Sequence, residues 1–214
     1  MVSWLTQVFK GIWKTGHVPD DWRKGIILPF YKGKGSRQDC KNYRGITLLS
    51  CPGKVFAHLL LVRVKDKLLS VRRPEQGGFT PQRSAVDRIA LLNLLLQGRR
   101  EHARLLWIDY VDLRADAFDS VDRTALWALA ATPKHWHISS KLIDMFKNLY
   151  TDTVSCVRLG GELSDWFLFG SGVRQEQGCT VAPSLFLLPV DWGTPTHKSC
   201  MEASLGDAGH GDLY

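Results

Sequence analysis

The chain has 214 residues, 44% of them hydrophobic, which is enough apolar content for one sizeable core. No apolar run reaches membrane-spanning length, and the first ten residues lack the basic-then-apolar order of a secretory signal. Five scattered cysteines without metal-ligand spacing favour a reduced protein over a disulfide scaffold. We therefore expect an intracellular protein, in the nucleus or cytoplasm, with no membrane partner.

The net charge of +7 is unevenly distributed along the chain. Residues 1–104 hold 20 Lys/Arg and 7 Asp/Glu, a net +13, whereas residues 105–214 hold 8 and 14, a net −6. A basic half joined to an acidic half suits a polyanion-binding protein that also holds a metal ion. The alternative is a protein with an ordinary solvated basic surface, and charge alone does not decide between the two.

The first elements follow from periodicity. Met1 to Lys14 has apolar residues at helical spacing, which predicts an amphipathic helix ended by Gly16 and Pro19. A turn then precedes a predicted strand at 25–31, where Pro29 indicates an edge or a bulge.

A glycine-rich basic loop follows at 32–37, Lys-Gly-Lys-Gly-Ser-Arg. Its glycines would let the backbone approach a phosphate, although a flexible hairpin tip is the commoner use of such a loop. The segment 42–54 leads from it into a predicted helix from Val55 to about Leu69.

The next segment, 73–81, contains Gly77, Gly78 and Pro81 and is predicted to be a loop. Ser84 or Pro81 is expected to start the helix that follows it. The expected core face of that helix consists of Ile89, Leu91, Leu92, Leu94, Leu95 and Leu96.

The centre of the chain joins an apolar run to a series of acids. The apolar residues of 105–111 predict a buried strand. The acids that follow are Asp109, Asp112, Asp116, Asp119 and Asp122. A strand that ends in carboxylates could hold magnesium, which prefers hard oxygen ligands, and a solvated acidic turn is the alternative.

Two helices and a hairpin come next. Helices are predicted from Arg123 to Ala131, with Leu126, Trp127 and Leu129 inward, and from a Ser139 cap to Tyr150. Residues 153–159 alternate as a strand, Gly160-Gly161 makes a turn, and 165–169 returns as the hairpin partner. A glycine loop from Gly172 then leads into a helix that contains Pro189.

Four stretches resemble motifs of LINE-type (non-LTR) retrotransposon reverse transcriptases, in the family's order. Val-Asp-Leu-Arg-Ala-Asp-Ala-Phe-Asp-Ser-Val-Asp-Arg at 111–123 resembles the first palm motif. The segment 22–56 resembles the fingers hairpin, and Gln-Gly-Gly-Phe with a downstream Arg-Ser at 76–84 resembles the next fingers motif. Gly-Val-Arg-Gln-Glu-Gln-Gly-Cys at 172–179 resembles the glycine loop beneath the template–nucleotide pair.

The resemblance implies an α+β fold, an incomplete fingers and palm fragment whose antiparallel palm sheet is backed by helices. It implies a basic fingers-like region with a β-hairpin at 1–104, a partial palm at 105–192 and a poorly ordered tail at 193–214. It also implies RNA-directed DNA synthesis on an RNA template and a DNA primer, with deoxynucleoside triphosphates and Mg²⁺. The oligomeric state is not specified.

The resemblance also assigns roles to residues. Asp112 is the catalytic aspartate, and it binds metal together with the carbonyl of Leu113. The residues implied to face the nucleotide are Lys32, Lys34, Arg44, Phe118, Gln175, Gln177 and Gly178. Those implied to line the template track are Gln76, Phe79, Arg83 and Arg174.

The sequence departs from the family pattern in several places. Asp116 lengthens the first palm motif, and Glu176-Gln177 lengthens the glycine loop, so that either Gln175 or Gln177 fills the family's glutamine position. The sequence stops at Tyr214, before the family's Tyr-x-Asp-Asp box, and we expect it to be inactive as written. The alternative reading is a non-catalytic nucleic-acid-binding remnant.

A third reading comes from a different class of protein. The spacing from Asp112 to Asp116 is also that of aspartyl-phosphate hydrolases, but it lacks a βαβ pattern around it. It leaves the other motifs unexplained.

Overall fold

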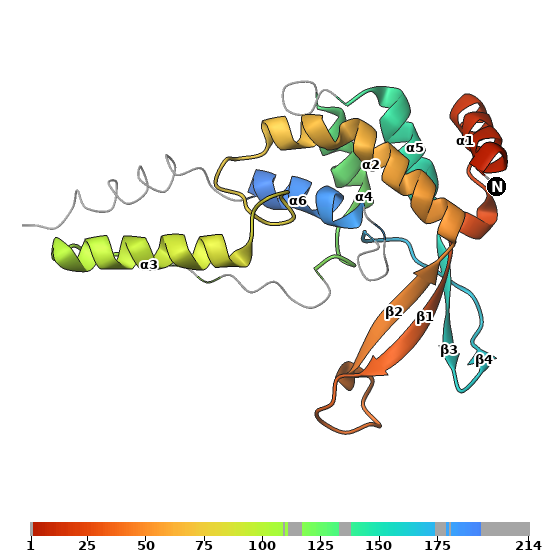
Figure 1. Ribbon diagram of the computed structural model, residues 1–214. Coiled ribbons are helices and arrows are strands. Elements are labelled where there is room, and N and C mark those ends of the chain that lie inside the picture. Colours follow the sequence, from red (N-terminus) through yellow and green to blue (C-terminus); the bar gives the residue numbers. More distant parts are fainter. Residues whose placement is uncertain are drawn as a thin grey trace, which may run out of the picture.

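The computed structural model describes residues 2–108, 110, 117–132, 138–173, 179 and 181–193. Within these residues the chain forms six α-helices and one five-stranded sheet. Most of the helices lie together at one end of the sheet, and the β1–β2 hairpin extends away from them (Figure 1). The fold is therefore α+β, as the sequence predicts.

The N-terminal helix α1, Val2–Thr15, forms where apolar residues recur at helical spacing. It ends at Gly16, which has a φ of +76°. The short 3-10 helix η1, Asp20–Trp22, follows and buries Trp22. The rings of Phe9, Trp22 and Phe56 pack together with centroids 5.4 to 6.0 Å apart, so that the predicted turn anchors α1 to the core.

Strands β1, Lys24–Tyr31, and β2, Tyr43–Leu49, form the predicted hairpin, paired from Gly25↔Leu49 to Tyr31↔Tyr43. The 3-10 helix η2, Cys40–Asn42, lies in the connection. Strand β1 also pairs with β3, but only over 24–27. Pro29 thus lies in the half of β1 that has a neighbour on one side only, where its missing N–H costs no ladder bond.

The second part of the sheet consists of β3, Val154–Leu159, β4, Glu162–Leu163, and β5, Phe167–Leu168. Gly160 and Gly161 both have positive φ and form the predicted two-residue turn between β3 and β4. The β1–β3 pairing is parallel, so the sheet is mixed, whereas an antiparallel sheet was expected. The helices between these two strands make the long crossover that a parallel pair requires.

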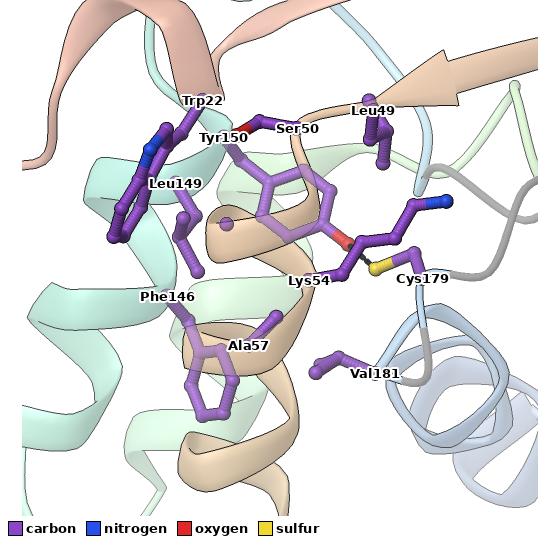
Figure 2. Close-up of a pocket in the computed structure, with 11 residues that line it drawn as sticks. Trp22, Leu49, Ser50, Lys54, Ala57, Phe146, Leu149, Tyr150, Cys179 and Val181 are labelled. Atoms are coloured by element: carbon purple, nitrogen blue, oxygen red, sulfur yellow. Dashed lines mark hydrogen bonds between the residues drawn. The ribbon is translucent and has the colours of Figure 1, made fainter. Parts of the chain in front are cut away.

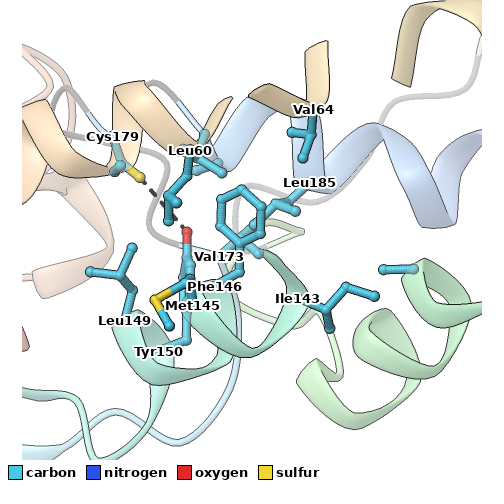
Figure 3. Packing of buried hydrophobic residues seen from close by; sticks show 14 of the residues in the cluster. Leu60, Val64, Ile143, Met145, Phe146, Leu149, Tyr150, Val173, Cys179 and Leu185 are labelled. Atoms are coloured by element: carbon cyan, nitrogen blue, oxygen red, sulfur yellow. Dashed lines mark hydrogen bonds between the residues drawn. The ribbon is translucent and has the colours of Figure 1, made fainter. Parts of the chain in front are cut away.

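The core lies among four helices: α2 (Cys51–Val71), α4 (Arg123–Ala131), α5 (Ser140–Tyr150) and α6 (Ala182–Gly193). Helix α2 begins four residues earlier than predicted, because Pro52 is tolerated in the first turn of a helix. Figure 3 shows Leu60 and Val64 of α2 facing α5 and α6. The buried residues at this junction include Phe146, Leu149, Val173, Leu185 and Leu188.

Helix α3, Ala85–Glu101, corrects one prediction. Ser84 caps it as expected, but none of its residues is buried, and Ile89, Leu91, Leu94 and Leu95 are exposed. Residues 91, 92, 94, 95 and 96 are all leucine, and at 100° per residue they spread over about 200° of the helix circumference, wider than a single packing stripe. The expected core face of α3 is therefore wrong.

The apolar run before the acids corrects a second prediction. Residues 105–108 and Tyr110 form no strand, and Leu105 and Trp107 are 80% and 87% exposed. An apolar run becomes a strand only where a neighbour takes its backbone hydrogen bonds, and no described strand pairs with this segment.

Three further observations bear on the membrane, cysteine and tail predictions. No described helix is long and apolar enough to span a bilayer. The thiols of Cys40, Cys51, Cys156 and Cys179 are free. Of the expected tail at 193–214, only Gly193, the last residue of α6, belongs to the described residues.

Candidate nucleic-acid interface

The tip of the β1–β2 hairpin is held in shape by local contacts. The Tyr31 hydroxyl donates to the Gly35 carbonyl, and the Tyr43 hydroxyl donates to the Arg37 carbonyl at 2.9 Å. The Lys32 ammonium donates to the Lys41 carbonyl at 2.8 Å. The glycine-rich loop is thus a shaped turn, in which Gly33 and Gly35 adopt positive φ.

The same tip is strongly basic. Its cations Lys32, Lys34, Arg37, Lys41 and Arg44 are all exposed, and the one acid, Asp39, accepts a hydrogen bond from the Lys41 amide. Arg44 lies opposite Phe30 in the ladder. Three predicted phosphate-facing residues, Lys32, Lys34 and Arg44, therefore share one projecting basic surface.

The predicted template residues lie on the loop between α2 and α3. The Gln76 side chain accepts from the Gly78 amide at 2.9 Å, which folds the glutamine back on its own loop. Phe79 adopts a φ of +47° and is 59% exposed, and Arg83 is exposed. A large apolar residue rarely adopts a left-handed backbone conformation, and here its side chain is also exposed to solvent.

Arg72 and Arg73 connect this loop to α6. The Arg72 guanidinium donates to the Gly78 carbonyl and the Thr80 hydroxyl, and the Arg73 amide donates to the Asp191 carboxylate at 3.4 Å. Burial lowers the pKa of Arg72 below its ordinary value, while the negative charge of Asp191 opposes that shift. Asp191 is itself buried, so the loop has a fixed charged anchor.

The first palm motif and the glycine loop meet in space. The Val173 amide donates to the Phe118 carbonyl at 2.7 Å, and the Gly172 amide donates to the Val121 carbonyl at 2.8 Å. The Ser171 hydroxyl donates to the Asp119 carbonyl at 2.9 Å. Two stretches some fifty residues apart are thus joined through their backbones.

Gly172 is required by this junction. Its φ is +78°, and a Cβ built on it would lie 2.5 Å from the Cα of Asp119. No side chain fits there, because the obstacle is backbone and cannot rotate away.

Arg123 secures the junction, and sequence reasoning did not select it. Its guanidinium donates to the carbonyls of Gly172, Ser171 and Tyr150 at 2.8, 2.9 and 2.6 Å. A cation in the first turn of a helix opposes the helix dipole, and that mismatch is the signal that could have pointed to a second role for Arg123.

Phe118 packs on the helix that follows the glycine loop. Its ring stacks on Phe186 of α6 with centroids 3.8 Å apart and planes at 17°. The ring is half-buried at the rim of the core. Phe118, which the resemblance predicts to face the nucleotide, is therefore fixed by α6, while Lys32, Lys34 and Arg44 lie on a separate element.

Comparison with known proteins finds two relatives, although no protein-family model matches the chain. It is 29% identical over 187 residues to the Transposon TX1 uncharacterized 149 kDa protein of Xenopus laevis, covering 87% of this chain and 14% of that protein. It is 27% identical over 156 residues to the Retrovirus-related Pol polyprotein from type-2 retrotransposable element R2DM of Drosophila melanogaster, covering 70% of this chain and 14% of that protein. This chain is related to non-LTR retrotransposon proteins. It spans about one seventh of the length of either relative.

Several candidate site residues and motif insertions lie outside the described residues. They are Asp109, Asp112, Leu113, Asp116, Arg174, Gln175, Glu176, Gln177 and Gly178. The structure therefore leaves their roles as predictions.

The described acids do not make a metal site. Asp122 caps α4, and its carboxylate accepts from the Thr124 and Ala125 amides at 2.7 and 3.3 Å. Within the described ranges, no group of three His, Cys, Asp or Glu side chains could hold a metal ion. The predicted metal ligands Asp112 and Leu113 lie outside the described residues.

The predicted phosphate residues lie at the tip of the β1–β2 hairpin, and the predicted template residues lie on the loop that follows α2. The 21 residues of α2 begin beside the hairpin and end at the loop that carries Gln76 and Phe79, as Figure 1 shows. At 1.5 Å per residue the helix is about 30 Å long. Nucleic acid that touched both sets would have to span the length of the hairpin as well as that of α2.

One small cavity lies near the start of α2. It is lined by Trp22, Leu49, Lys54 and Tyr150 among others, and its volume of about 30 Å³ is that of one water molecule (Figure 2). The Tyr150 hydroxyl contacts the Cys179 sulfur at 3.7 Å in its wall. The cavity is too small for a nucleotide, so it is a packing gap.

Proposed function

We propose that this chain is part of the reverse transcriptase of a non-LTR retrotransposon, an RNA-directed DNA polymerase, and contributes its fingers and part of its palm. The observation that carries the proposal is the junction of Phe118 and Val121 with Gly172 and Val173. In the family resembled, the first palm motif and the glycine loop both border the incoming nucleotide. A junction between the matching stretches supports that reading, because neither match was chosen for its proximity to the other.

Within this proposal the described residues have distinct tasks. Lys32, Lys34 and Arg44 would neutralise the phosphates of the deoxynucleotide or of nearby nucleic acid, with Arg44 able to bind two phosphate oxygens through its planar fork. Phe118, held against Phe186, would form a fixed floor for the sugar.

The template strand would meet a second set of residues. Phe79 offers an exposed ring on which a base can stack, and Gln76 and Arg83 lie on the same loop. Arg174 would complete this set. The partners are an RNA template, a DNA primer and deoxynucleoside triphosphates.

Asp112 and the carbonyl of Leu113 would hold Mg²⁺, through oxygen ligands of the kind that this ion prefers. When bound, the ion would stabilise charge that develops on the reacting phosphate. Asp112 is the one carboxylate of the 214 residues that matches the family's metal set, so its contribution alone would be incomplete.

A second candidate function is nucleic-acid binding without catalysis. The exposed basic hairpin favours it, because binding through phosphates requires the cations and no metal site. Both candidates share one prediction, that the hairpin binds nucleic acid.

The test measures binding of a labelled RNA–DNA duplex by fluorescence anisotropy at several salt concentrations. The triple variant Lys32→Ala, Lys34→Ala, Arg44→Ala should bind more weakly, with a slope of log affinity against log salt reduced by roughly 2 to 3, because each phosphate contact contributes about 0.9. The matched control removes the same charge from exposed positions in the last turn of α3 and just after it, Arg99→Ala, Arg100→Ala and Arg104→Ala. Equal salt slopes in wild type and hairpin variant would refute the role of the hairpin.

A further inference from the structure

A groove between α1 and α2 lies apart from the residues that the proposed function uses. It has a volume of about 630 Å³. Its lining residues are Thr6, Phe9, Lys10, Trp13, Lys14, Phe56, Leu59, Leu60 and Arg63. Its floor is apolar and aromatic, and its charged groups are all positive.

The cations of the groove have no anionic partner among the described residues. Lys10, Lys14 and Arg63 line it, and no acid does. Asp20 pairs with Arg23 and Asp21 with Lys24, and neither acid lines the groove. Helix α1 contains no Asp or Glu at all.

Trp13 holds two of the nearby cations in position. The Arg63 guanidinium lies 4.4 Å from the centre of the indole ring, and the Lys141 ammonium of α5 lies 4.8 Å from it. Stacking fixes a guanidinium through its face and leaves its N–H edge directed outward. Arg63 is thereby preorganised to donate to an oxyanion.

The three cations that line the groove without a lining acid repel one another, and an anion that enters the groove relieves that repulsion. The floor adds a second requirement, because Phe9, Trp13 and Leu59 present apolar surface to the occupant. A ligand that combines phosphates with flat apolar rings satisfies both, and single-stranded nucleic acid has that chemistry.

We propose that the α1–α2 groove binds single-stranded RNA or DNA, with phosphates on Lys10, Lys14 and Arg63 and bases on the aromatic floor. The inference rests on the proposed nucleic-acid function but uses none of its residues. In Figure 1, α1 lies beside the start of α2 and α5, whereas the hairpin tip lies at the far end of β1 and β2. A strand in this groove would therefore be additional to one at the hairpin.

The first experiment locates the strand. The whole chain is mixed with a 12-nucleotide RNA that contains 4-thiouridine, irradiated and digested, and the crosslinked peptides are identified by mass spectrometry. We expect crosslinks to peptides that contain Trp13 or Arg63. Crosslinks confined to the hairpin, residues 32–44, would overturn the groove and leave the proposed function standing.

The second experiment measures charge. The variant Lys10→Ala, Lys14→Ala, Arg63→Ala should lose the groove crosslinks and lower the salt slope for the RNA by roughly 2, since a single strand contributes about 0.7 per phosphate. The variant Lys10→Arg, Lys14→Arg keeps the charge and should keep both signals. Circular dichroism checks that each variant is folded, and the α3 variant Arg99→Ala, Arg100→Ala, Arg104→Ala serves as the charge-matched control.

Two outcomes separate this inference from its alternatives. If polyaspartate of equal charge displaces the RNA as well as unlabelled RNA does, the groove is a site for an acidic protein and the nucleic-acid assignment fails. If the hairpin variant loses duplex binding while the groove variant binds and crosslinks as wild type does, the groove alone is refuted. Absence of any RNA binding by the wild-type chain would overturn both proposals.

Discussion

At the scale of single residues, Gly172 carries the contact between the two halves of the proposed site. Replacing it with alanine forces a Cβ against the backbone of Asp119 and holds alanine at positive φ. We expect Gly172→Ala to lower the free energy of unfolding by about 2 to 4 kcal/mol, the sum of left-handed strain and a clash that side-chain rotation cannot relieve. Urea denaturation, read as a lower midpoint at unchanged slope, measures the effect.

Gly11 provides the control for this substitution. It lies within α1, and a Cβ built on it would meet nothing within 4 Å. Gly11→Ala should therefore raise stability by about 0.5 to 1 kcal/mol, because alanine loses less conformational freedom in a helix. Similar effects of the two substitutions would contradict the close approach at Gly172.

At the scale of elements, α3 depends on its own sequence because it buries no residue. Its first turn is closed by a capping box in which the Ser84 amide and hydroxyl bond with Asp87. The Ser84 amide, and then the Ser84 hydroxyl hydrogen bond, hold the pKa of Asp87 below its ordinary value. A lowered folded-state pKa stabilises the helix above the ordinary pKa, and this stabilisation is lost as pH falls through the folded value.

We therefore expect the start of α3 to fray in acid, below about pH 4. Cα chemical shifts of residues 85–87, followed from pH 7 to pH 2.5, measure the change. Asp87→Asn, which cannot titrate, should give a flat profile with less helix at neutral pH. A wild-type profile as flat as that of the variant would show that the carboxylate does not hold the cap.

Elements were predictable where local pattern and tertiary packing agree. Helix α1 follows from a single apolar stripe, and the β3–β4 turn follows from Gly160-Gly161, because two positive-φ positions favour that hairpin. The leucines of α3 and the apolar run at 105–108 gave equally strong signals but are not buried. Burial depends on a neighbouring element, and sequence periodicity contains no information about which neighbour is present.

At the scale of the whole molecule, the resemblance located pieces of the candidate site but not their assembly. Phe118 and Gly172 were each selected by a local motif, and their proximity became visible only with the hydrogen bonds that join 118–121 to 172–173. The resemblance assigned no role to Arg123, the last residue of the 111–123 motif. Its partners are backbone carbonyls from two other segments, Tyr150 and Ser171-Gly172. Every residue has a backbone carbonyl, so the sequence does not show which carbonyls will accept hydrogen bonds from Arg123.

The number of metal-binding carboxylates determines the polymerase activity that we expect of these 214 residues. Family members hold two magnesium ions with several carboxylates, and the sequence in hand supplies one match, Asp112. We predict that a preparation of these residues binds an RNA–DNA duplex but does not extend the primer with Mg²⁺ and all four deoxynucleotides. The substitution Asp112→Ala should leave duplex binding unchanged, because the cations that we assign to binding lie on other elements.

Two lengthened motifs reinforce this expectation and can be tested with it. Asp116 and the Glu176-Gln177 pair would displace residues beside the nucleotide, and a displacement of about 1 Å can cost on the order of a hundredfold in rate. Fusing the chain to a family Tyr-x-Asp-Asp segment and thumb should restore extension only when these three residues are also deleted. Extension by the fusion without the deletions would show that the insertions are tolerated. Template-dependent extension by the 214 residues alone, abolished by Asp112→Ala, would refute the prediction of binding without synthesis.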